Sequence, residues 1–201
     1  MDLSATTLRL ARLRDARDLL AIYEPYVRNT CISFELEPPS AEEFRKRMSN
    51  VMAYHPYLVA ECEGVPIGYC YATFFRPRLG YRPSVETSIY LRQDVRGGGV
   101  GRRLYRALGK LLRMQNVYNS YACIAVTDPP TDLTPATSRL FHEKVGYSLV
   151  GTFPSCGYKL DNWVDMVWME KALLEHVEQP EPFIPFPELD PVQIQAVLDS
   201  E

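Results

Sequence analysis

One segment constrains the fold of this chain more than any other, because it joins a strand pattern to a helix pattern through a run of glycines. From Val95 to Arg103 the sequence reads VRGGGVGRR, with four glycines in the five positions 97–101. Glycines leave backbone amides unshielded, and the first N–H groups of a helix lack intrahelical partners. This combination is typical of an anion cradle. Arg102 and Arg103 oppose the helix dipole, and a bound pyrophosphate would offset that conflict.

The two most familiar nucleotide-binding loops do not fit this segment. A P-loop requires Lys and then Ser or Thr after its last glycine, where this chain has Arg102 and Arg103. A dinucleotide-binding fingerprint that starts at Gly99 requires a glycine at position 104, which is Leu104. The residues alone therefore indicate an anionic ligand without identifying it, and a glycine-rich loop that binds no ligand stays open as the alternative.

Apolar periodicity on both sides of the loop predicts a mixed α/β domain. The expected order is β-α-α-β-β-β-α-β-α-β-β, a mixed sheet with helices on its faces. Asp15 is expected to cap the first helix, and Ser40 with Glu43 has the spacing of a capping box for the second. The expected later elements are a hairpin over 57–62 and 65–75, strands at 84–91, 120–127, 147–152 and 164–170, and helices at 101–115 and from about 134 to Gly146.

Composition excludes several classes of function. The net charge of −3 gives no overall attraction to nucleic acid or to an anionic membrane surface. The five cysteines have no metal-ligand spacing, so no metal site is expected, and their odd, scattered set favours a reducing compartment. With no apolar signal-peptide core and no membrane-length apolar run, the expected location is the cytoplasm.

We expect the domain to span residues 1–175 and a proline-rich C-terminal tail to span 176–201. The segment QPEPFIPFPELDP is too rich in proline for a helix, which predicts an extended tail. Phe183, Ile184 and Phe186 favour packing of this tail on the domain or on a neighbouring subunit over a fully solvated tail.

Five pieces of the sequence, in order over residues 8–171, match the pattern of one known family. They are ISFE at 32–35 with Pro38-Pro39, VETSIYL at 85–91, the glycine loop, LFHEKVGY at 140–147, and GYK at 157–159 with Asn162-Trp163. In the glycine loop, Arg96-x-x-Gly99-x-Gly101 fits the signature R/Q-x-x-G-x-G/A. On these pieces the chain resembles the phosphinothricin acetyltransferase branch of the GNAT superfamily of N-acetyltransferases, to which that signature belongs.

The resemblance implies a GNAT fold, with a central, mixed, splayed sheet of six to seven strands flanked by helices on both faces. It also implies acetyl-CoA as the cofactor, a small-molecule amine as the acceptor, and a homodimer. The strand that carries Ile89, Tyr90 and Leu91 should diverge from the strand near Cys123–Val126, so that its free backbone groups pair with the pantetheine arm. The implied cofactor-binding residues are Ile89, Tyr90, Leu91, Arg96, Gly97, Gly98, Gly99, Val100, Gly101 and Arg102.

Two residues are the predicted catalytic groups. An amine attacks a thioester only when it is neutral, so the reaction needs a proton acceptor. Glu86 lies in an otherwise largely apolar run and matches an acidic strand position of the family, which predicts a general base; the alternative is a solvent-facing carboxylate. His142 matches the family's helix histidine, which predicts a role in proton transfer or in protonating the departing thiolate, with Tyr147 as a competitor. Direct transfer in a ternary complex is favoured over an acyl-enzyme on Cys123, because a thiol buried in a strand is inert.

The sequence departs from the family pattern in three places. Pro135 stands where the family has a cofactor-contacting asparagine, so that contact is expected to be lost or to be replaced by Thr134 or Ser138. The family's tryptophan-histidine pair reads Trp163-Val164, and the proline-rich tail has no counterpart in the family motifs. The predicted acceptor-binding residues are Phe34, Glu35 and Tyr158, with Arg76 and Arg78 as further candidates. A protein or peptide N-acetyltransferase and a non-catalytic acyl-CoA-binding module remain as alternative functions.

Overall fold

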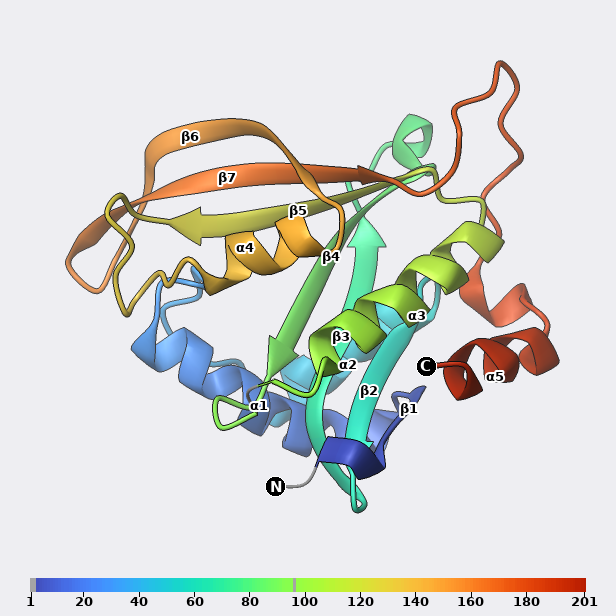
Figure 1. Ribbon diagram of the computed structural model, residues 1–201, viewed down its shortest axis with the longest axis horizontal. Helices are drawn as coiled ribbons and strands as arrows, with labels where there is room; N and C mark the ends of the chain where they lie inside the picture. The colour runs from blue at the N-terminus through green and yellow to red at the C-terminus, as the bar shows by residue number, and fades with distance from the viewer. Residues whose placement is uncertain (1–2, 96) are drawn as a thin grey trace.

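The computed structural model describes residues 3–95 and 97–201, and it has the predicted order of strands and helices followed by one further helix. Seven strands form one sheet in the order β1-β2-β3-β4-β5-β7-β6 (Figure 1). Their bounds are β1 Thr6–Leu10, β2 Tyr57–Cys62, β3 Val65–Phe74, β4 Ser84–Leu91, β5 Asn119–Val126, β6 Ser148–Lys159 and β7 Asn162–Ala172. β4 and β5 pair in parallel, and the other neighbours pair antiparallel, so the sheet is mixed as predicted.

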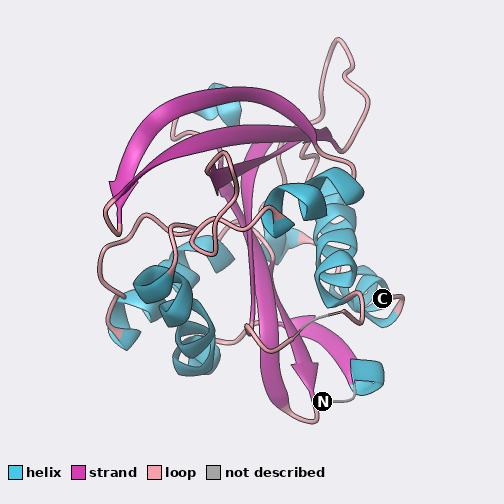
Figure 2. Ribbon diagram, turned by 60° about the vertical axis from the view of Figure 1, so that its left-hand side comes forward, coloured by secondary structure: helices cyan, strands magenta, loops and turns pink. Residues whose placement is uncertain are grey.

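Helices cover both faces of the sheet (Figure 2). One side, here called the α1 face, is covered by α1 (Ala16–Asn29) and α2 (Ala41–Met52), which pack on alternate side chains of β2 and β3 such as Val59 and Tyr69. The other side, the α3 face, is covered by α3 (Val100–Met114), which packs on the intervening residues such as Leu58 and Cys70. α4 (Thr137–Lys144) follows β5, and α5 (Pro191–Asp199) lies against α3 and β1. Because side chains alternate along a strand, each face has its own core.

Local sequence signals explain several of the boundaries. The hydroxyl of Ser40 accepts a hydrogen bond from the amide of Glu43 at 3.1 Å, which confirms the predicted cap of α2. Asp15 precedes α1 as predicted, but its carboxylate accepts from the amide of Arg12 and from the guanidinium of Arg9, so it caps the short 3₁₀ turn before the helix. α4 begins at Thr137, so Pro135 lies just before the helix.

Two expectations for the C-terminal third are corrected. β6 and β7 extend to a tight turn at Leu160 and Asp161, and they are therefore longer than the predicted strands. The tail packs on the domain, since Ile184 exchanges hydrogen bonds with Gln115 and Phe186 is buried. It is extended only at first, because residues 191–199 form α5, with Asp190 as the N-cap and Pro191 in its first turn. No helix in the described ranges is long and apolar enough to cross a membrane.

Candidate active site

A gap opens in the middle of the sheet, where β4 and β5 diverge (Figure 1). Their pairing consists of Ser84 with Asn119, Val85 with Ser120 and Glu86 with Tyr121, and it stops there. The hydroxyl of Thr87 donates to the carbonyl of Tyr121 at 3.1 Å. The Thr87 side chain thus satisfies the carbonyl of Tyr121 at the apex of the gap. Beyond this point, β4 is not paired with β5. The divergence predicted for residues 89–91 is confirmed.

The glycine loop leads from the open end of this gap into α3. Gly97, Gly98 and Gly99 have φ values of 78°, 63° and 68°, a left-handed run that only glycine adopts readily. Among the described residues, no backbone carbonyl accepts from the amides of residues 97, 98, 101 or 102. A Cβ on Gly101 would lie 3.1 Å from the ring of Phe141, so the helix start is also tightly packed. The loop therefore presents bare amides at a helix N-terminus, as an anion cradle requires.

The two arginines that follow the glycines have different roles. Arg102 is exposed and available to an anion. Arg103 instead donates to the carbonyls of Thr6 at 2.9 Å and of Glu201, so the protein itself holds its guanidinium. Val100 is buried under the loop. Arg96, the first residue of the predicted signature, lies outside the described residues.

The other predicted cofactor residues line the free part of β4. The side chain of Ile89 reaches the start of α3 near Gly101. Tyr90 packs its ring on the α1 face against Tyr23 and Tyr26, and its backbone pairs with Tyr69 of β3, so the backbone groups that face the gap are those of Ile89 and Leu91. The carbonyl of Leu91 already accepts a hydrogen bond from the hydroxyl of Tyr26, so the acceptor predicted there is engaged by the protein itself.

Glu86 lies at the apex of the gap, with its side chain half-buried on the α1 face. Burial raises the pKa of its carboxyl above the ordinary value, and the positive charge of Arg76 opposes this shift. On the same face, Thr73 of β3 pairs with Glu86. Tyr71 pairs with Ser88, which is the next residue of β4 on that face. Thr73, Tyr71, Tyr57 and Arg47 line a cavity of about 240 Å³ between the sheet, α1 and α2. A half-buried carboxylate beside such a cavity is placed to accept a proton.

His142 lies on the α3 face, and both of its ring nitrogens are engaged. Nδ1 is 2.8 Å from the carbonyl oxygen of Ser138, and Nε2 is 3.0 Å from the hydroxyl of Tyr105. A carbonyl only accepts, so Nδ1 carries the proton and, in the neutral ring, Nε2 accepts from Tyr105. Burial lowers the pKa of His142, which favours this neutral form. Tyr105 continues the chain of contacts to Thr87, and from there to Tyr147 and Ser120.

Cys123 is not an activated nucleophile. Burial raises the pKa of its thiol to about 12, and the negative charge of Glu86 acts in the same direction. The thiol is therefore protonated at neutral pH and cannot attack a thioester efficiently. This geometry favours direct transfer over an acyl-cysteine intermediate.

The predicted acceptor residues are only partly brought together. Phe34 packs against Gly157 of the β6–β7 hairpin, where an added Cβ would lie 2.3 Å from its ring. Glu35 forms an ion pair with Arg47, which lines the cavity on the α1 face. Tyr158 is 55% exposed, and its hydroxyl lies 3.4 Å from Asp161 in the hairpin turn, so no described contact joins it to that cavity.

The departures from the family pattern have local structural explanations. Val164 is fully buried and packs with Cys31 and Ala125, so an apolar side chain suits this position. Thr134 is also buried, and its hydroxyl bonds to those of Thr127 and Thr131. It is therefore committed to its own loop, which does not favour the expectation that it replaces the family asparagine.

Sequence reasoning missed two features of this site. The tyrosines at positions 57, 69 and 71 stack on one another on the α1 face, and the alternation of Tyr69 with Tyr71 was the available signal. Lys159 is buried, and its ammonium group donates to the carbonyls of Val27 and Ser33, both at 2.6 Å. No local pattern could reveal that tether, because its partners are more than 100 residues away in sequence.

Comparison with known proteins gives a matching family and several similar enzymes. Residues 8–168 match the Acetyltransferase (GNAT) domain family. The chain is 37% identical over 170 residues to the phosphinothricin N-acetyltransferase of Alcaligenes faecalis, covering 84% of this chain and 83% of that protein. It is 31% identical over 172 residues to the L-methionine sulfoximine/L-methionine sulfone acetyltransferase of Pseudomonas paraeruginosa, covering 84% and 95% of the two chains.

A solved structure gives a similar result. The phosphinothricin acetyltransferase from Sinorhizobium meliloti, crystallised in complex with AcCoA, superposes with a TM-score of 0.79 at 32% identity. The superposition covers 90% of this chain and 98% of that chain.

Proposed function

The chain belongs to the GNAT acetyltransferase family, and from this premise we propose that it transfers the acetyl group of acetyl-CoA to the amine of an amino acid or of an analogue such as phosphinothricin or methionine sulfoximine. The observation that carries the proposal is the position of Glu86, half-buried at the apex of the gap and beside the cavity on the α1 face. A cavity of about 240 Å³ suits a small acceptor better than a protein segment.

The proposed reaction is a direct attack within a ternary complex. Glu86 takes a proton from the acceptor ammonium, directly or through a water, and the neutral amine attacks the thioester carbon. The amide of Leu91 is proposed to stabilise the oxyanion. The glycine-loop amides of residues 97–102 hold the pyrophosphate of the acetyl donor, and Arg96 is proposed to join them. The C–S bond then breaks, the amide nitrogen gives up its second proton, and the departing thiolate takes up one proton; His142 is proposed to support this step through Tyr105.

The arginine side chains near Glu86 favour an acceptor that carries a carboxylate. The guanidinium of Arg47 is already paired with Glu35 and Glu43. Arg76 forms no ion pair with a described carboxylate; it lies over the rings of Phe75 and Trp168, and its charge reaches Glu86. Arg76 is therefore proposed to attract the carboxylate of an amino-acid acceptor.

Two finer proposals concern the setting of the enzyme. We propose a homodimer, which is supported by exposed apolar side chains on the edge strand β6, namely Leu149, Val150 and Phe153. We also propose a cytoplasmic location, because the five cysteines form no disulfide in the described chain and three of them are buried.

The test is a screen for thiol release from acetyl-CoA with amino acids, methionine sulfoximine, methionine sulfone, phosphinothricin, polyamines and short peptides as acceptors. The proposal expects turnover with compounds that carry an α-amino acid group. Turnover confined to peptides would support a peptide acetyltransferase instead. Binding of acetyl-CoA without turnover of any acceptor would favour a non-catalytic binding module.

A further inference from the structure

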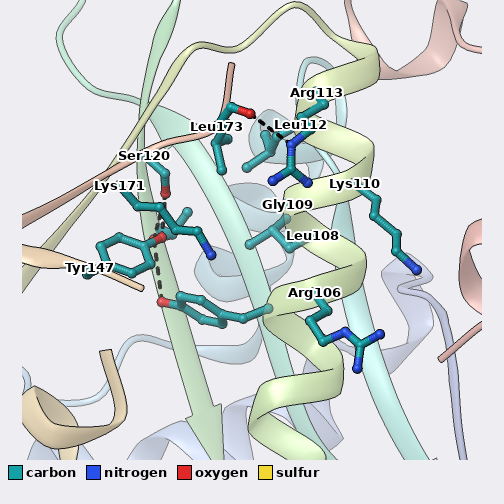
Figure 3. Close-up of a pocket in the computed structure, with 12 residues that line it drawn as sticks. Arg106, Leu108, Gly109, Lys110, Leu112, Arg113, Ser120, Tyr147, Lys171 and Leu173 are labelled. Carbon is teal, nitrogen blue, oxygen red and sulfur yellow. Dashed lines mark hydrogen bonds between the residues drawn. The ribbon is translucent and has the colours of Figure 1, made fainter. Parts of the chain in front are cut away.

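A second cavity, of about 180 Å³, lies on the α3 face between the later part of α3 and the end of β7 (Figure 3). Its lining includes Thr87 and Ser120, next to the apex of the gap, and Gly109 and Arg113 from the second half of α3. Thr87 points to the opposite face of β4 from Glu86, because consecutive strand residues alternate. The cavity is therefore separate from the cavity beside Glu86, and it is at the other end of α3 from the glycine loop.

Two cations that are not neutralised by a carboxylate converge on this cavity. Figure 3 shows the ammonium of Lys171, from β7, and the guanidinium of Arg113, from α3, both directed into the space beside Gly109. Lys171 donates to the carbonyl of Val145 and Arg113 Nε donates to that of Leu173 at 2.8 Å. In the described part of the chain, no Asp or Glu forms an ion pair with either residue.

The other charges along the cavity do not cancel these two. Arg106 and Lys110 also line it, and both form ion pairs with the same carboxylate, that of Glu201. Burial lowers the pKa of Lys171, and the positive charge of Arg113 acts in the same direction. A partly buried cation that faces a second cation is stabilised by an anion between them.

The rest of the lining suits a compact oxyanion. The hydroxyls of Ser120 and Tyr147, which are hydrogen-bonded to each other, lie at the inner wall, and Gly109 leaves room in front of them because it has no side chain. Arginine presents a planar fork of donors to a phosphate or carboxylate, lysine adds a point charge, and hydroxyls supply further donors.

We propose that this cavity is a binding site for a small oxyanion such as inorganic phosphate, held by Arg113 and Lys171 beside the hydroxyls of Ser120 and Tyr147. The site is independent of the acetyl-donor site at the glycine loop. It adds a second anion position to the α3 face, directly behind the apex of the gap.

The test is a calorimetric titration of sodium phosphate into the full chain at constant ionic strength, with sodium chloride as the reference salt. It is run without and with saturating coenzyme A, because the glycine loop can itself bind phosphate. The variants are Lys171→Met and Arg113→Met, each expected to weaken phosphate binding by about tenfold or more. Arg139→Met, which removes an exposed guanidinium of α4 paired with Glu143, is the matched control and is expected to change nothing.

The outcomes separate the sources of the phosphate. Saturable binding that persists with coenzyme A and is lost in both variants supports a site for a free oxyanion. Binding that coenzyme A abolishes, and that both variants also lose, means that a phosphate of coenzyme A fills the cavity and overturns its independence. Phosphate binding that is absent, or that is unchanged in both variants, overturns the proposal. Circular dichroism and a melting curve of each variant show that it is folded.

Discussion

The carboxylate of Glu86 and the imidazole of His142 lie on opposite faces of the sheet at β4. Glu86 is on the α1 face beside the tyrosine-lined cavity, and His142 reaches Thr87 on the α3 face through the hydroxyl of Tyr105. The strand between them runs along the gap. The two predicted catalytic groups are thus placed to act on different partners, the acceptor on one side and the acetyl donor on the other.

Removal of the Glu86 carboxylate should abolish proton abstraction without affecting donor binding. We expect Glu86→Gln to lower kcat by about 10²-fold or more, while coenzyme A binds as in the wild type. The variant keeps the size of the side chain, so any loss reflects the missing base. Steady-state kinetics and a direct binding measurement check both parts, and wild-type turnover at every pH would remove Glu86 from the mechanism.

The same carboxyl should set the acid limb of the pH profile. A general base works only when it is deprotonated, so kcat/KM falls as the pH drops through its pKa. Burial raises that pKa, and the limb should therefore lie above the range of an ordinary glutamate. The limb should be missing from the residual activity of Glu86→Gln.

His142 and Tyr105 should behave as one unit. We expect His142→Phe and Tyr105→Phe to lower the free energy of unfolding by roughly 1–3 kcal/mol each, since each leaves the other without its buried partner. We expect similar losses of kcat, and a double variant that is no worse than either single one. A far larger loss of kcat in His142→Phe than in Tyr105→Phe would instead assign direct proton donation to the histidine.

The role of the glycine loop in donor binding can be tested by comparing Gly97 with Gly64, a glycine of similar φ outside the loop. Gly97 has a φ of 78° and Gly64, in the β2–β3 turn, has a φ of 79°, and a Cβ on either would meet nothing within 4 Å. Alanine at either position should cost about 1 kcal/mol of stability. Only Gly97→Ala should raise the KM for acetyl-CoA. An equal KM in the two variants would show that the loop does not bind the donor.

The hydrogen bond from Lys159 to Ser33 should fix the position of residues 33–35, which include the predicted acceptor-binding residues Phe34 and Glu35. The ammonium of Lys159 holds the carbonyl of Ser33, next to Phe34 and Glu35. We expect Lys159→Met to raise the KM for the acceptor by about tenfold, with a smaller change in the KM for acetyl-CoA, because residues 33–35 are then no longer held by the ammonium group. Lys144→Met, at an exposed position of α4, is the control. Equal changes in both KM values would indicate general destabilisation instead.

His55 should make the protein sensitive to acid. It is 1% exposed and packed between Phe74 and Phe183, and burial lowers its pKa from 6.5 to about 4, with the charge of Arg82 acting in the same direction. The unfolded chain binds the proton more readily, so stability is complete above pH 6.5 and decreases as the pH falls towards 4. The loss should be about 3 kcal/mol. Urea unfolding at pH 7 and pH 4.5 measures it, and His55→Phe should remove most of the difference.

The sequence was sufficient for features that depend on neighbouring residues. Period-2 and period-3.6 patterns located the strands and helices up to β5, and the clustered glycines located the loop, because these signals arise from local backbone geometry. The helix at 191–199 also had a local signal, since Asp190 and Pro191 begin it and Ile194 and Leu198 share one face, but the prolines before it obscured that signal.

Features that depend on distant contacts were not readable in this way. The sequence shows that Arg103 opposes the helix dipole, but it does not show that the guanidinium binds carbonyls at both ends of the described chain. The partners of Lys159 and the aromatic cavity beside Glu86 exist only after β2, β3 and α1 have been assembled. Side-chain partners are set by tertiary packing, which a single sequence does not display.

The divergence of β4 from β5 also divides the molecule mechanically. Strands β1–β4 form one lobe and β5–β7 form another, and the sheet is continuous between them only through three residue pairs, Ser84–Asn119, Val85–Ser120 and Glu86–Tyr121. A small rotation about this narrow neck would change the width of the opening and would leave the ladders inside each lobe intact. Because Glu86 belongs to the neck itself, this rotation would move the unpaired parts of β4 and β5 much more than it would move the carboxylate.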